Sequence, residues 1–171
     1  MTFQSHILSV GLLAVVFSIT ARAQSLPQVS LNADNLGPRA IEQLTGTNIT
    51  RNYSMAWHAM ALALEQNRAD LLNDQFTGFA KDHLAQRIAG QQQNGLRVQM
   101  VDRGHRVKAV FYSLDGGAMQ LIDDAQINLQ VFDGSRLIYS DDAPHRYLVL
   151  MTPGADRWYV RNLQRISDTE R

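Results

Sequence analysis

One acidic residue lies where the sequence otherwise places apolar side chains. Between residues 119 and 131 every second position is mostly apolar, as Met119, Leu121 and Ala125 illustrate, and Asp123 shares their parity. A carboxylate in an apolar pocket has a raised pKa and could act as a general base. The structural alternative is that Asp123 and Asp124 mark a bulge or a break between two shorter strands, after which parity no longer applies. Asp123 is therefore the candidate catalytic residue.

Other residue types offer little chemistry. The histidines at 58, 83, 105 and 145 form neither an i,i+4 pair nor an H-E-x-x-H motif, so the sequence predicts no metal site. His58 and His83 read as residues at the boundary of helix faces, and His105 and His145 as the first residues of strands near the sheet rim. No cysteine nucleophile and no G-x-S-x-G elbow are present, and we expect no cofactor.

Five aromatic residues could line a pocket for a small apolar ligand. They are Tyr53, Trp57, Phe79, Phe111 and Trp158. The alternative is that the same side chains fill the core, because large aromatic residues are commonly buried for packing alone.

The charge balance excludes some partners. The 171 residues carry a formal net charge of zero, with 16 basic and 16 acidic side chains. No global field would therefore attract nucleic acid, and Arg97, Arg106 and Lys108 form too small a basic patch for a nucleic-acid footprint. We expect no nucleic-acid partner.

The N-terminus has the pattern of a signal peptide. Residues 7–19 form an apolar run that is too short to span a membrane comfortably, and Ala21-Arg22-Ala23 has the form of a cleavage motif. The sequence predicts a signal peptide over residues 1–23, cleavage after Ala23 and a secreted or periplasmic protein. An uncleaved membrane anchor is the alternative. Because cysteine is absent, packing must hold the exported chain together without disulfides.

Residues 24–94 read as a tether followed by helices. Residues 24–37 show no period and are expected to be a flexible tether. Pro38 could begin a short helix that reaches Leu44. A longer helix, capped by Thr47 or Asn48, carries an apolar stripe through Trp57 to Leu64, and another is expected over residues 76–94.

After Gly95 the apolar period changes to two. Glycine turns divide residues 96–166 into strands, with Asp133-Gly134 as a strong hairpin signal. The expected fold class is α+β, with N-terminal helices packed on the apolar side of a bent antiparallel sheet. A bent sheet around a helix encloses a pocket.

This order of elements resembles the nuclear-transport-factor-2-like superfamily, the cystatin-like α+β cone. The resemblance covers residues 38–166 and also rests on the joint between Asn67 and Asp70 and on the closing strand Arg157-Trp158-Tyr159-Val160. It implies one cone domain over residues 38–171. Isomerases of this superfamily use an inward aspartate, which would give Asp123 that role by resemblance.

The order of helices and strands is most similar to two branches of the superfamily, the mitochondrial import-motor tether and the type IV secretion inner-membrane scaffold. Members of these branches mostly bind partners, so the resemblance favours an exported binding or scaffold module over an enzyme. Its ligand would be a small apolar molecule or a protein partner. A homodimer could form on the solvated sheet face of Gln120, Gln126, Asn128 and Gln130. The alternatives are an isomerase- or hydrolase-like enzyme with Asp123 as base, and a membrane-anchored subunit of an envelope complex.

Overall fold

The computed structural model describes residues 25–167 as two helices against one curved sheet. The helices are α1 (Gln43–Gln66) and α2 (Gly78–Gln93), joined through the short 3-10 helix η1 (Ala69–Leu72). The strands are β1 (Val29–Asn32), β2 (Leu96–Tyr112), β3 (Met119–Asp133), β4 (Arg136–Asp141), β5 (His145–Pro153) and β6 (Trp158–Ile166).

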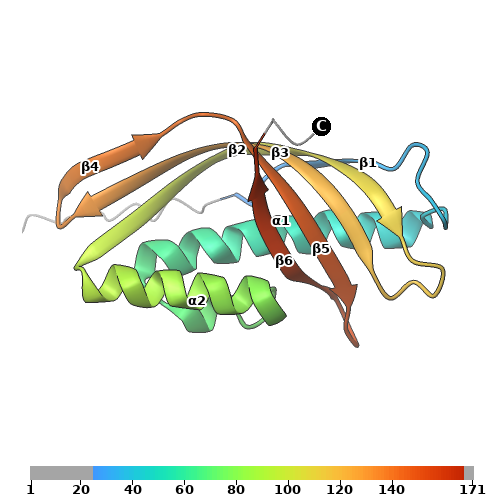
Figure 1. The fold of residues 1–171 in the computed structure, drawn as a ribbon, viewed down its shortest axis with the longest axis horizontal. Coiled ribbons are helices and arrows are strands. Elements are labelled where there is room, and N and C mark those ends of the chain that lie inside the picture. The colour runs from blue at the N-terminus through green and yellow to red at the C-terminus, as the bar shows by residue number, and fades with distance from the viewer. Residues whose placement is uncertain (1–24, 168–171) are drawn as a thin grey trace, which may run out of the picture.

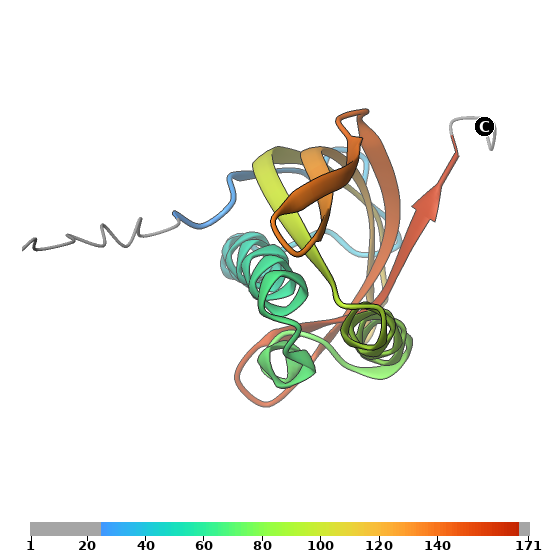
Figure 2. The same cartoon turned by 90° about the vertical axis from the view of Figure 1, so that its left-hand side faces the viewer.

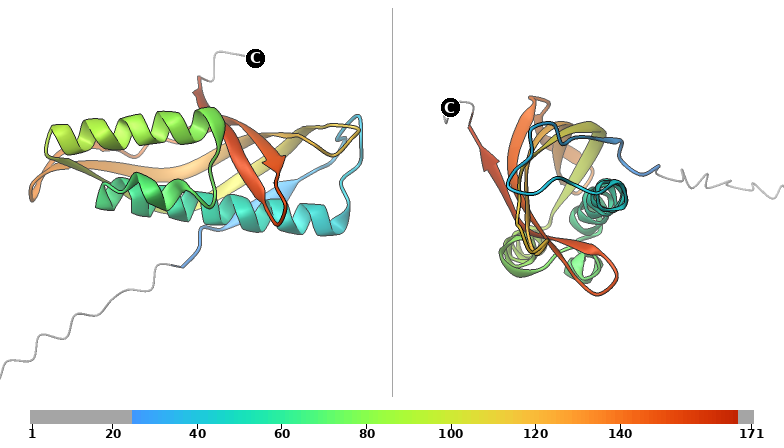
Figure 3. Two further views of the ribbon diagram at one scale, coloured as in Figure 1. Left: turned by 90° about the horizontal axis from the view of Figure 1, so that it is seen from below. Right: turned by 90° about the vertical axis from the view of Figure 1, so that its right-hand side faces the viewer.

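The sheet has the order β1-β2-β3-β5-β6, and β4 pairs with the far end of β3. All pairs are antiparallel except β1 with β2, which is parallel. Figure 1 shows the sheet arching over α1 and α2, and Figure 2 shows the helices inside its curve. Seen from below in Figure 3, α1 and α2 lie side by side across the concave face. The α+β class predicted from the sequence is confirmed.

Helix α1 carries the core stripe that its periodicity predicts. Ile49, Tyr53, Trp57, Met60 and Leu64 are all buried along one side of it. Burial of a large apolar side chain contributes about 1.5–3 kcal/mol to stability, so this stripe fixes the helix on the sheet. The N-terminus differs from the expectation, because the cap is Glu42 rather than a residue at 47 or 48.

Strand β3 presents its odd-numbered side chains to the helices, as parity predicts. Met119, Leu121, Asp123 and Ala125 are fully buried. Asp123 and Asp124 lie in one unbroken stretch of pairing with β5, where they face Tyr147 and Arg146. The Asp-Asp pair therefore marks no break in the strand, and Asp123 points inward.

The segment before α1 corrects two expectations. Residues 24–37 are not an irregular tether throughout, because β1 forms within them and pairs with β2 from His105 to Lys108. No separate short helix forms from Pro38, because residues 38–42 are not helical and α1 begins at Gln43; Pro38 bridges Tyr112 instead. A strand thus precedes the helices. The predicted signal or anchor segment, residues 1–23, lies outside the described residues, and no helix within 25–167 is long and apolar enough to cross a bilayer.

Two irregularities in β2 bend the strand and reset its parity. The register against β3 shifts between Asp102 and His105 and again between Ala109 and Phe111. Gly104, expected as a turn, lies inside the strand at φ 119°. The second shift turns Phe111 outward, to 40% exposure, while Tyr112 becomes buried. Bulges of this kind increase local twist and redirect side chains.

Replacing Gly104 by alanine is expected to lower the unfolding free energy by about 1–3 kcal/mol, because a side chain is strained at this positive φ. The added Cβ would also lie 3.4 Å from the Gln28 carbonyl oxygen. Urea denaturation measures the change. Gly90→Ala is the control, since it lies within α2 with open space around it and should stabilise by about 0.5–1 kcal/mol. Equal effects of the two substitutions would contradict this account of Gly104.

Candidate functional site

Four polar side chains form a hydrogen-bonded chain inside the core. Tyr53 Oη donates to Asp123 Oδ2 over 2.7 Å, and His105 Nδ1 donates to the same oxygen over 2.8 Å. The other ring nitrogen, Nε2, donates to Asp102 Oδ2 over 2.8 Å. The Asp123 and His105 side chains are 0% exposed, whereas that of Asp102 is 15% exposed. We call these four residues the buried acid–histidine cluster.

The β2 bulge positions the histidine of this cluster. Asp102 Oδ1 accepts a hydrogen bond from the Gly104 backbone N–H over 2.8 Å, which folds the carboxylate back toward His105. The His105 backbone N–H donates to Gln28 O over 2.8 Å, so the segment before β1 holds the other side of the bulge. His105 is therefore mid-strand and buried, and the prediction of a rim position is wrong. The buried position could have been predicted from the sequence, because His105 shares the parity of the apolar residues Val107 and Ala109.

His105 is held as an imidazolium. Burial, the largest single influence, lowers its pKa, but hydrogen bonds and charge interactions with Asp102 and Asp123 outweigh it and raise the pKa to about 9. The Trp57 ring lies against the imidazolium, with 4.4 Å between ring centroids and 35° between planes. An aromatic face at this distance favours a cation. Burial also raises the pKa of Tyr53 well above 10, reinforced by the nearby Asp123 charge, so Tyr53 stays a neutral donor.

In this geometry Asp123 acts as a buried acceptor of hydrogen bonds. Its Oδ2 accepts from both Tyr53 and His105, while its Oδ1 has no hydrogen-bond partner among the described residues. A general base must come within hydrogen-bond reach of the proton it removes. Asp123 is fully buried and is absent from the lining of the inner cavity described next. Its role as a general base stays a prediction.

A cavity of about 400 Å³ lies between the two helices and the concave face of the sheet. We call it the inner cavity. Its lining is mainly apolar, with Trp57 and Met60 from α1, Leu84 from α2, and Ile127 and Leu129 from β3. This volume falls within the roughly 300–1,000 Å³ of small-molecule sites. The inner cavity is therefore large enough for a compact ligand.

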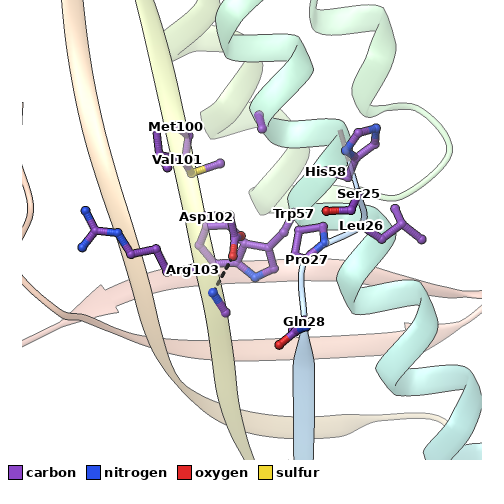
Figure 4. Close-up of a pocket in the computed structure, with 12 residues that line it drawn as sticks. Ser25, Leu26, Pro27, Gln28, Trp57, His58, Met100, Val101, Asp102 and Arg103 are labelled. Atoms are coloured by element: carbon purple, nitrogen blue, oxygen red, sulfur yellow. Dashed lines mark hydrogen bonds between the residues drawn. The ribbon is translucent and has the colours of Figure 1, made fainter. Parts of the chain in front are cut away.

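A second hollow lies on the opposite side of Trp57. This N-terminal groove, about 480 Å³, is roofed by residues 25–28 and lined by polar as well as apolar groups. Figure 4 shows Asp102 and Trp57 facing Pro27 across it, with His58 at one side. The Ser54 hydroxyl fixes the roof by donating to Pro27 O over 2.6 Å. Trp57 lines both hollows, so its ring forms part of the wall between them.

The five aromatic residues proposed as pocket lining have different positions. Trp57 lines the inner cavity. Tyr53 belongs to the buried acid–histidine cluster, and Trp158 packs near Tyr112 with 6.3 Å between ring centroids. Phe79 is 68% exposed, because the buried stripe of α2 runs through Ala80, Leu84 and Ile88 instead. Phe79 and Phe111 therefore line no interior pocket, which corrects the expectation for both.

Sequence reasoning missed two aromatic residues of the cavity, Tyr139 on β4 and Tyr147 on β5. Tyr147 lines it from β5 and meets the Trp57 ring edge-on at 5.3 Å. Its position in β5 directly opposite Asp123 places it on the inner face. The apolar run Tyr147-Leu148-Val149-Leu150 hid this, because a run without alternation does not show which residues point inward.

On the outer face of the sheet, Asn128 is less exposed than the sequence predicts. Asn128 is only 8% exposed, and its amide donates to Ser140 Oγ over 3.4 Å. Asp142, just after β4, interacts with Asn128 and pairs with Arg103 at 2.8 Å, so this corner of the chain covers that part of the sheet. A partner surface on this face stays a prediction, and it would involve Gln120, Gln126 and Gln130 rather than Asn128.

Known proteins resemble this chain in structure alone. No sequence profile of a protein family and no curated protein sequence matches it. The intermembrane-space region of the chloroplast protein ARC6 is 16% identical, with a TM-score of 0.64 over 77% of this chain and 100% of that one. A candidate dehydratase of the NTF2-like family from Streptomyces avermitilis is 12% identical, with a TM-score of 0.47 over 70% and 96% of the two chains.

A protein of unknown function with a cystatin-like fold, from Nostoc punctiforme, gives a TM-score of 0.44 at 12% identity, over 76% of this chain and 96% of that one. At 16% identity, the likeness to the ARC6 region shows a common fold and says nothing of activity. These structures do not identify a branch of the superfamily, and β1, which precedes the helices, removes the argument from element order. The chain has an α+β cone fold and shares it with the ARC6 intermembrane-space region.

Proposed function

We propose that this protein is an exported binding module that holds a small, largely apolar ligand in the inner cavity. The observation that carries the proposal is the cavity itself, about 400 Å³ in volume, which lies between α1, α2 and the concave sheet and opens to solvent near Arg165. The lining of this hollow is mainly apolar, which suits a small apolar ligand.

The walls of the cavity support this proposal. Trp57 and Tyr147 offer ring surface, and Met60 and Met100 offer unbranched side chains that adapt to irregular shapes. Both helices are also fixed on the sheet by buried residues outside the cavity lining, α1 by Ile49 and Tyr53 and α2 by Ile88. A site on rigid elements needs little ordering when the ligand arrives, which reduces the entropic cost of binding.

Filling the cavity should abolish binding. Ala80 lines it from α2 and is 3% exposed, so Ala80→Phe would place a ring where the ligand lies. We expect N-phenylnaphthylamine, a neutral fluorescent apolar probe, to bind the unmodified protein with enhanced emission. The variant should bind it at least about ten-fold more weakly, because the added ring takes up space that the probe would fill; ten-fold corresponds to about 1.4 kcal/mol of binding free energy.

Ala89→Phe is the matched control, because it adds the same ring to the exposed side of the same helix. It should leave probe affinity unchanged. Thermal melting of both variants confirms that each is folded before titration. If N-phenylnaphthylamine does not bind the unmodified protein, or binds the Ala80→Phe variant equally well, the proposed function is wrong.

A further inference from the structure

The polar groups of the inner cavity gather at one end. Arg165 on β6 pairs in register with Tyr147 on β5, and its guanidinium lies 3.5 Å from Asp141 Oδ2 at the end of β4. Arg87 on α2 lies close enough to influence the pKa of Tyr147. His83, one helical turn before Arg87, lines the same cavity. The remaining lining is apolar, so the cavity has a charged end and an apolar body.

The charges at this end do not balance. Asp141 is the one acidic residue in the cavity lining, against the two guanidinium groups of Arg87 and Arg165. A hydrogen bond from the Ala143 backbone N–H, together with Arg165, lowers the pKa of Asp141, so this carboxyl is ionised. Arg87 makes no ion pair within residues 25–167, which leaves one uncompensated positive charge at the cavity.

A neutral histidine lies behind the charged end. The His145 side chain is 0% exposed, its Nε2 lies 3.7 Å from Asp141 Oδ2, and neither ring nitrogen has a hydrogen-bond partner among the described residues. Burial, with a smaller influence from Arg165, lowers the pKa of His145. The ring adds no positive charge, so the surplus belongs to the arginines. His145 is absent from the lining of the inner cavity, so its ring nitrogens take no part in the charged end.

We propose that the ligand of the inner cavity is an amphipathic monoanion, a carboxylate with an apolar body, whose charged group lies between Arg87 and Arg165. This inference rests on the proposed function and narrows its ligand class. Guanidinium groups bind carboxylates through paired, charge-assisted hydrogen bonds. A single surplus positive charge fits one negative charge, and a dianion would meet the Asp141 carboxylate. The apolar body would extend toward Trp57 and Met60.

The test compares two competitors with the same apolar body. Dodecanoate and dodecanol differ in the carboxylate alone, and each is titrated against bound N-phenylnaphthylamine at neutral pH and below its micelle concentration. We expect dodecanoate to displace the probe roughly ten-fold more effectively than dodecanol, the effect of one charge-assisted hydrogen bond. The variant Arg87→Gln should remove most of this difference between dodecanoate and dodecanol.

Lys81→Gln is the control for overall charge, because it removes one positive charge from the same helix outside the cavity lining. It should leave the preference for dodecanoate intact. A preference that is absent in the unmodified protein, or that Lys81→Gln reduces as much as Arg87→Gln does, overturns the inference. Binding of N-phenylnaphthylamine distinguishes failure of this inference from failure of the proposed function. If the probe binds and dodecanoate displaces it no better than dodecanol does, the anion proposal fails and the apolar-ligand proposal stands.

Discussion

Asp123→Ala is expected to lower the unfolding free energy by about 3–5 kcal/mol, the usual cost of removing one partner from a buried ion pair. The substitution would leave the His105 imidazolium with no partner on Nδ1 and the Tyr53 hydroxyl without an acceptor, both in the core. Neither group could be solvated without opening the space between α1 and the sheet. Urea denaturation followed by tryptophan emission measures the change, since Trp57 lies against His105.

Asp124→Ala is the control for this variant, since it removes the same side chain from the next residue, on the other face of β3. Asp124 is 39% exposed and pairs with Arg146 at 2.7 Å, and pairs this exposed contribute about 0–1 kcal/mol. The two variants should therefore differ by several-fold in their effect on stability. Similar losses from both would mean that the buried acid–histidine cluster is not the stabilising element described above.

Stability should also decline in alkaline solution because of His105. Its pKa is about 9 in the folded protein against an ordinary value of 6.5, so the folded state binds the proton more tightly than the unfolded chain. A raised pKa of this kind contributes stability that is complete below pH 6.5 and is lost as the pH rises through 9. The shift corresponds to roughly 3 kcal/mol of unfolding free energy.

Urea denaturation at pH 6.5 and at pH 9 tests this expectation, with most of the loss falling between them. His105→Gln keeps a polar side chain and removes the titration, so its stability should change much less over the same interval. It should also be the less stable protein at the lower pH. If the unmodified protein and the variant respond to pH alike, His105 is not held as an imidazolium.

The fold elements that could be predicted are those with a strong local period. The α1 stripe and the alternation along β3 each depend on side chains a few residues apart, and both were predicted correctly. Strand β1 could not be found this way, because four residues carry almost no period and form a strand only by pairing with β2. The same dependence on a distant partner hid the bulge at Gly104, where the Gln28 carbonyl accepts from His105.

The candidate site could be predicted only in part, because a local pattern identifies single residues and not their distant partners. Asp123 stood out because it broke an apolar pattern, and its inward position follows from parity. Its partners could not be inferred, since Tyr53 is 70 residues away and His105 lies beyond an expected turn. Phe111 shows the converse error: parity placed it inside, and a bulge one residue earlier turned it outward.

The indole of Trp57 lies against His105 of the buried acid–histidine cluster and also lines the inner cavity. A ligand in the inner cavity would therefore contact the same ring that stabilises the protonated form of His105. Occupancy and protonation are then coupled equilibria, and by reciprocity each alters the other by the same factor. In such a protein the affinity for the ligand would depend on pH, and no domain movement would be needed for release.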